Sequence, residues 1–206
     1  MYQEIELISK RNRVLRIKDN GKSYIRKIFS NESSFHTELE VLEKLQEKSY
    51  RIPRILETGN NEITFYDLGD VTLLDWLEDA EKNGITQYED IINDLLALLN
   101  ELYTLFRQVF NDDLILSDMN FRNIIIFEGK LHRVDFEQVS RGSKSSDLGK
   151  LLAYLMNYYP ENSNWKKAFR DSLIRILEDD SSMNMSEILI FEQEEIKAMI
   201  KRRSKG

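Results

Sequence analysis

The chain has 206 residues, of which 41% are hydrophobic and 32% charged, with two prolines and eight glycines. This composition excludes a disordered chain and fits one globular unit or two small lobes that share a core. A formal net charge of -7 argues against a protein whose whole surface binds nucleic acid, although it leaves room for a local basic patch. The absence of cysteine excludes a disulfide framework, a zinc–thiolate site and a cysteine nucleophile.

No segment has the pattern of a membrane protein. The N-terminal MYQEIELISKRNRV lacks the apolar core of a secretion signal, and no apolar run approaches the roughly 18 residues of a membrane span. The two longest candidates, IINDLLALLNELYTLF and LGKLLAYLMNYY, carry polar residues at helical spacing. We therefore expect a cytoplasmic protein with no membrane partner.

The first part of the chain is predicted to be a small sheet with one inserted helix. The runs EIELIS, VLRIKD and KSYIRKIF read as strands, and DNG at 19–21 marks a tight turn between the last two. Cap-type residues precede an amphipathic helix over about 33–47. The stretch RIPRILETGNNEITFYDLGD then reads as strand, turn and strand.

From residue 72 the hydrophobic period becomes helical. TLLDWLEDAEKNG and TQYEDIINDLLALLNELYTLFRQVF each predict a helix, and three more are expected at about 146–159, 162–178 and 185–203. Between them, NIIIF and LHRVDF predict a short hairpin with a turn at 128–130. The sequence therefore predicts an α+β fold of two lobes, with a β-rich N-lobe over 1–69 and a mainly α-helical C-lobe over 70–206.

Three polar residues flank this hairpin. Asn123 starts its first strand, Asp135 ends its second, and Asp118 lies in the loop that leads in. An antiparallel pairing brings Asn123 and Asp135 to the same end. Two carboxylates and an amide oxygen form a hard-oxygen site suited to Mg²⁺, and an aspartate can take a proton from a hydroxyl nucleophile. Such a set is what phosphoryl transfer from a nucleotide requires.

The string SDMNFRNIIIF…VDFE resembles the catalytic loop and metal-binding motif of the protein-kinase-like superfamily. It is most similar to the aminoglycoside and choline phosphotransferase branch, and to small atypical kinases of the RIO and KEOPS type. The resemblance implies ATP and Mg²⁺ as cofactors, Asp118 as the catalytic aspartate, and Asn123 and Asp135 as metal ligands. It also implies that Asp147 is a buried brace for the catalytic loop.

The N-terminal half carries the same order of motifs. Lys27 in YIRKIF resembles the strand lysine that holds the nucleotide phosphates, and Glu38 in ELEVLEKL resembles the helix glutamate that pairs with it. The segment Tyr66, Asp67 and Leu68 falls where the superfamily's hinge reads the adenine edge through backbone groups. The resemblance covers roughly residues 1–155.

The residues alone leave other interpretations open. Asp118 and Asn123 are of types that also serve as ordinary turn and cap residues. Strand alternation does not decide whether Lys27 or its neighbour Arg26 enters the site. Glu40 and Glu43 lie on the same predicted helix as Glu38, so the sequence does not decide which glutamate pairs with the lysine. Charged residues on a helix usually form its solvated face. The alternative interpretation of Lys27 is an exposed strand lysine with no role in a site.

Two departures from the resemblance bear on activity. Leu116 and Ser117 replace the His-Gly that precedes the catalytic aspartate, and the turn SKRNR offers Lys10, Arg11 and Arg13 in place of a glycine-rich loop. Our expectation is a phosphotransferase that acts on a hydroxyl of a small molecule or protein. The alternative is a catalytically impaired pseudokinase that serves as a binding or regulatory module. The acceptor, the choice of ATP or GTP and the oligomeric state stay open.

Overall fold

The structure, a computed structural model, describes residues 2–204, which form two compact units. The first unit contains the residues up to 71 together with 125–139, and the second contains 72–124 and the residues from 140 on. The predicted boundary between residues 69 and 70 lies beside the first of these divisions. Residues 125–139, which the sequence placed in the C-lobe, pack with the N-terminal unit instead.

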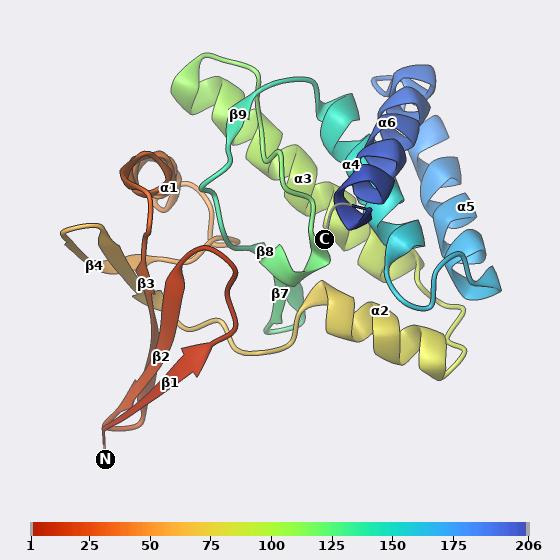
Figure 1. The fold of residues 1–206 in the computed structure, drawn as a ribbon. Helices are drawn as coiled ribbons and strands as arrows, with labels where there is room; N and C mark the ends of the chain where they lie inside the picture. Colours follow the sequence, from red (N-terminus) through yellow and green to blue (C-terminus); the bar gives the residue numbers. More distant parts are fainter. Residues whose placement is uncertain (1, 205–206) are drawn as a thin grey trace. The chain divides into compact units, whose positions relative to one another are not determined.

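The first unit is built on a five-stranded antiparallel sheet in the order β1-β2-β3-β5-β4 (Figure 1). Its strands are β1 (Gln3–Leu7), β2 (Arg13–Asp19), β3 (Lys22–Ile28), β4 (Ile55–Gly59) and β5 (Glu62–Tyr66). The predicted tight turn between β2 and β3 is confirmed, because Asn20 and Gly21 have φ of 48° and 77°, as a two-residue hairpin loop requires. In β3, Lys27 stands between Val14 of β2 and Ile63 of β5.

The inserted helix α1 (Glu32–Leu45) confirms the sequence prediction within two residues. It begins at Asn31, whose side chain accepts a hydrogen bond from the Ser34 amide. Its buried face contains Phe35, Val41, Leu42 and Leu45 and also one charged residue, Glu38. A glutamate among apolar neighbours needs a partner that compensates its charge.

Backbone hydrogen bonds join the hairpin of β7 (Ile124–Phe127) and β8 (Lys130–Arg133) to the segments that carry Val71 and Arg51. The Ile126 amide donates to Val71 at 2.8 Å, and the Arg133 amide donates to the carbonyl of Arg51 at 2.9 Å. Strand β8 ends earlier than LHRVDF predicts, so Asp135 lies in the loop that follows the strand. Asp135 has φ of 67°, a left-handed conformation that few non-glycine residues adopt.

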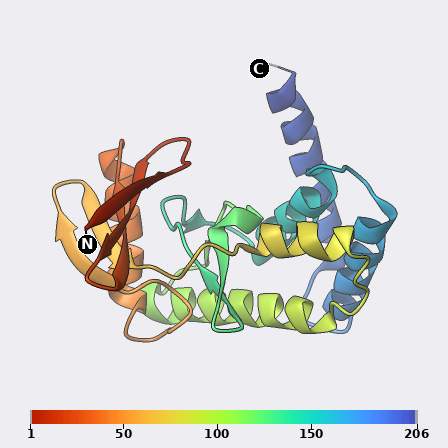
Figure 2. The ribbon, with the colours of Figure 1, turned by 90° about the horizontal axis from the view of Figure 1, so that it is seen from below.

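The second unit is mainly helical (Figure 2). It contains α2 (Leu73–Lys82), α3 (Glu89–Phe110), α4 (Lys144–Asn157), α5 (Asn164–Glu178) and α6 (Met185–Arg203), with the short strands β6 (Leu114–Ile115) and β9 (Ser140–Arg141) paired to each other. All five helices were predicted from the hydrophobic period. Within residues 2–204, no helix is long and apolar enough to cross a membrane.

Helices α4 and α6 approach each other closely at Gly149 (Figure 1). A Cβ atom at this position would lie 2.5 Å from Cβ of Phe191 and 2.7 Å from the amide nitrogen of Glu192. Both distances are too short for any side chain, so only glycine permits this packing. The contact ties the last helix to α4, which also carries Asp147.

Candidate functional site

The first unit gathers three carboxylates around one buried ammonium group. Nζ of Lys27 on β3 lies 2.6 Å from Oε2 of Glu38 on α1 and 2.8 Å from Oδ1 of Asp135 in the loop after β8. Oε2 of Glu137 in the same loop is 3.5 Å away. The Lys27 side chain is only 9% exposed and that of Glu38 only 2%, so this ion pair is shielded from water.

In this cluster, burial and the neighbouring opposite charges shift each pKa in opposite directions. Burial alone would lower the pKa of Lys27, but the Glu38 and Asp135 carboxylates more than offset it, so this pKa is raised and the ammonium stays charged. Burial raises the pKa of Glu38 to about 7, since Lys27 compensates only part of the lost hydration and Asp135 adds negative charge. Burial also opposes ionisation of Asp135, yet the neighbouring Lys27 holds the pKa of Asp135 below its usual range.

This geometry decides between the alternatives that the sequence left open in this unit. Arg26 alternates with Lys27 on β3, so its side chain leaves the strand on the opposite face. Glu40 and Glu43 are exposed on α1, whereas Glu38 is buried. Lys27 and Glu38 are therefore the buried pair.

The predicted hinge residues lie at the end of β5, and Asp67 among them forms a second ion pair. Asp67 lies 2.6 Å from Nε of Arg16 on β2, and its carboxylate accepts from the Ser23 hydroxyl at 2.6 Å and from the Gly69 amide at 2.9 Å. Although burial opposes ionisation of Asp67, these donors lower its pKa. The Tyr66 amide donates to Arg54 and the Asp67 amide to Ser23, so neither of these donors points to a ligand.

Within residues 2–204, the Leu68 amide, unlike those of Tyr66 and Asp67, donates to no backbone carbonyl. Tyr66, at the end of β5, is 50% exposed. Of the three hinge amides, that of Leu68 is therefore the one left to donate to a base.

The turn between β1 and β2 contacts the loop that carries Asp135. Nδ2 of Asn12 donates to Oε2 of Glu137 at 2.6 Å, and Nη1 of Arg11 lies 3.4 Å from Oε1 of the same carboxylate. Both oxygens of Glu137 are thus engaged, and its side chain is only 5% exposed. The sequence identified Arg11 as a cation of this turn but gave no role to Asn12.

The second unit holds the remaining predicted residues in the loop after β6. Nδ2 of Asn123, at the end of the short 3₁₀ helix η1 (Phe121–Asn123), donates to Oδ2 of Asp118 at 3.2 Å. Oδ1 of Asp118 accepts from the Asn120 amide at 3.0 Å. Because Asn123 donates through its nitrogen, its amide oxygen is the atom suited to a metal.

Asp147 at the start of α4 braces this loop, as the resemblance implied. Its carboxylate accepts from the amides of Leu116 at 2.8 Å and Ser117 at 3.0 Å, and from the Tyr103 hydroxyl at 3.0 Å. Burial raises the pKa of Asp147 despite these donors. Ser117 has φ of 64°, so it occupies a left-handed conformation in which glycine would be less strained.

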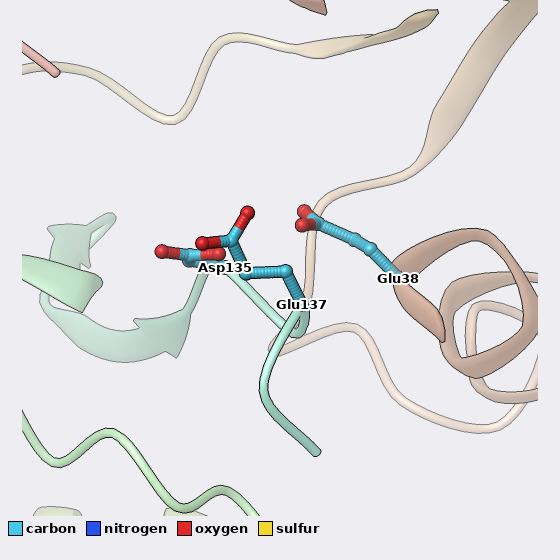
Figure 3. Close-up of side chains that lie close together, drawn as sticks. All are labelled: Glu38, Asp135 and Glu137. Carbon is cyan, nitrogen blue, oxygen red and sulfur yellow. The ribbon is translucent and has the colours of Figure 1, made fainter. Parts of the chain in front are cut away.

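Asp135, the predicted metal ligand of the first unit, lies in a group of oxygens whose chemistry fits a magnesium ion. Oxygen atoms of Glu38, Asp135 and Glu137 lie within 4.8 Å of one another, and Mg²⁺ prefers carboxylate oxygens. Figure 3 shows the three side chains reaching toward one another from α1 and from the loop after β8.

The structure thus brings the predicted site residues together in two groups. Lys27, Glu38 and Asp135 meet in the first unit, and Asp118 and Asn123 meet in the second. The hinge residues Tyr66–Leu68 lie at the end of β5, and Asp67 among them contacts Arg16, which sequence reasoning missed. The signal in the sequence was an arginine within the predicted strand VLRIKD, together with the aspartates of the segment YDLGD.

Comparison with known proteins supports a fold assignment. No family model and no curated protein sequence matches the chain. Among solved structures, the aminoglycoside phosphotransferase APH(4)-Ia matches with a TM-score of 0.53 at 12% identity, covering 97% of this chain and 93% of that chain. The kinase PK-1 of Cydia pomonella granulovirus matches with a TM-score of 0.50 at 13% identity, covering 68% of this chain and 55% of that one. The chain has a protein-kinase-like α+β fold, which confirms the predicted fold class.

Proposed function

We propose that this protein is an ATP- and Mg²⁺-dependent phosphotransferase that acts on a hydroxyl group of a small molecule or a protein. The observation that carries the proposal is the buried Lys27, which is held by Glu38 from a helix and by Asp135 from the loop after β8. A cation fixed in this way can bind phosphate oxygens without first being ordered. The structural neighbours that are themselves a phosphotransferase and a kinase support the same reading.

Each predicted residue has a role in this proposal. Lys27 binds the nucleotide phosphates, and Glu38 keeps it in place. Asp135 and Asn123 are the magnesium ligands, and bound Mg²⁺ would neutralise charge on the transferred phosphoryl group. Asp118 orients the acceptor hydroxyl and takes its proton, and the segment Tyr66–Leu68 contacts the base.

One observation favours the alternative, a pseudokinase that serves as a binding or regulatory module. Asn12 and Arg11 are bound to Glu137, whose carboxylate lies 3.5 Å from the Lys27 ammonium. In an impaired protein these contacts would persist when a nucleotide binds, so Arg11 and Asn12 would not contact its phosphates.

Thermal unfolding with nucleotide separates these two functions from a protein that does not bind nucleotides. For the enzyme, we expect ATP to raise the melting temperature in the presence of Mg²⁺, and the Mg²⁺-dependent part of the shift to disappear in Asp135→Ala. Asp19→Ala, which removes an aspartate at the end of β2, is the control and should keep the shift. The absence of a shift with any nucleotide would refute the proposal.

A further inference from the structure

Two segments far apart in the sequence lie against each other in the first unit. One is the turn between β1 and β2, which has no glycine, and the other is the loop after β8, which carries Glu137 two residues after Asp135. The two segments are 125 residues apart, yet Asn12 donates to Glu137 at 2.6 Å and Arg11 lies 3.4 Å from it. Side chains of the turn therefore bind a side chain of the loop that carries Asp135.

Asn12 is the centre of this contact. Its amide oxygen accepts from the Ser30 amide at 3.2 Å, while its amide nitrogen donates to Glu137. Its backbone N–H donates to Oγ of Ser9 at 3.3 Å, inside the turn. Because this backbone donor is already used, the donor that Asn12 can offer to an anion is its side-chain NH₂ group.

The charges make the contact exchangeable. Lys27 Nζ lies within 3.5 Å of carboxylate oxygens of Glu38, Asp135 and Glu137, and Arg11 lies 3.4 Å from Glu137. A phosphate group next to Lys27 would be repelled by Glu137 and attracted by the donors that Glu137 now binds. Guanidinium and amide groups are good donors to phosphate oxygens.

We propose that Arg11 and Asn12 are phosphate-binding residues that Glu137 holds in place until a nucleotide arrives. This inference rests on the proposed nucleotide-binding function. On binding, the phosphate oxygens replace the Glu137 carboxylate as acceptors for both side chains, and no covalent bond changes. The turn is then ordered in both states, by Glu137 without nucleotide and by phosphate with it.

The affinity test compares two neighbouring cations of the same turn. We expect Arg11→Ala to weaken binding of ATP with Mg²⁺ about tenfold, while Lys10→Ala, which removes the same charge one residue earlier, changes it less than about twofold. Adenosine, which has no phosphate, should bind both variants equally well. Isothermal titration calorimetry measures these affinities. Equal losses in the two variants would overturn the inference.

Hydrogen exchange of residues 8–13 tests the role of Glu137. In Glu137→Ala without nucleotide, the turn should exchange faster than in the wild type, and saturating ATP with Mg²⁺ should slow it again. Asn12→Ala should show the fast exchange without nucleotide and provides the same test if Glu137→Ala does not fold. Unchanged exchange in the variant that folds would overturn the inference.

The two proposals fail in different ways. If the wild type binds no nucleotide, both the function and the inference are wrong. If the wild type binds ATP but Arg11→Ala behaves as Lys10→Ala does, the inference alone is wrong and the function stands.

Discussion

Replacing Lys27 by methionine would test the buried ion pair of the first unit. The substitution keeps the length of the side chain and removes the ammonium that lies 2.6 Å from Glu38. Removing one partner of a buried ion pair typically costs about 3–5 kcal/mol, because the other charge is left without compensation. The loss of stability is smaller when Glu38 takes up a proton, which it does readily because its pKa is already raised to about 7.

The cost of Lys27→Met should therefore depend on pH. A carboxyl group whose folded pKa lies above its usual 4.5 stabilises the folded state at low pH, and this contribution is lost as the pH rises through the folded pKa. In the wild type the loss should level off above about pH 7. In the variant, Lys27 no longer lowers the pKa of Glu38, so the free energy of unfolding should keep falling above pH 7 by about 1.4 kcal/mol per pH unit.

Urea denaturation at pH 6, 7 and 8 measures these free energies, and a double-mutant cycle with Glu38→Gln isolates the pair. Lys22→Met, at the exposed start of the same strand, is the matched control and should change stability by less than about 0.5 kcal/mol at every pH. The reasoning would be refuted if wild type and Lys27→Met had the same pH dependence, or if the coupling between Lys27 and Glu38 were below about 0.5 kcal/mol.

Four further substitutions test the second unit by denaturation. Gly149→Ala should lower the free energy of unfolding by about 2 kcal/mol or more, because its Cβ would lie 2.5 Å from Phe191; a neutral effect would contradict the helix packing. Asp147→Asn should cost about 1–3 kcal/mol, since its NH₂ group would face the amide of Leu116; stability equal to wild type would show that the brace is dispensable. Ser117→Gly should be more stable than Ser117→Ala by about 1 kcal/mol, because both lose the hydroxyl but only glycine relieves the left-handed backbone; the reverse order would be inconsistent with φ of 64°.

Hydrophobic periodicity predicted the elements of this fold because it depends on local geometry. The 22 residues of α3 and the hairpin turn at Asn20 both follow from patterns a few residues long. The same patterns misjudged the end of β8, where Asp135 leaves the strand in a left-handed conformation. Apolar alternation continues to Phe136 and does not reveal that change of backbone.

The sequence predicted those residues of the candidate site that belong to motifs in a known order along the chain. Motif order indicated Lys27 and Glu38 but could not choose them over their charged neighbours, because that choice depends on which face of β3 and α1 is buried. The bond between Asn12 and Glu137 joins residues 125 apart in sequence, and no local pattern encodes it. The left-handed conformation of Ser117 was likewise invisible, although the glycine usual at this position in the resemblance was a signal.

Formation of ADP from ATP, measured in wild type and in Asp118→Asn, tests the proposed activity most directly. If the protein is a phosphotransferase, the wild type should release ADP in the presence of Mg²⁺, with water as the acceptor when no other hydroxyl compound is present. Asp118→Asn should lower this rate by at least about a hundredfold, the usual contribution of a general base, and should keep the thermal shift with ATP. Mg²⁺-dependent binding of ATP without any ADP formation in the wild type would contradict the phosphotransferase and favour the pseudokinase.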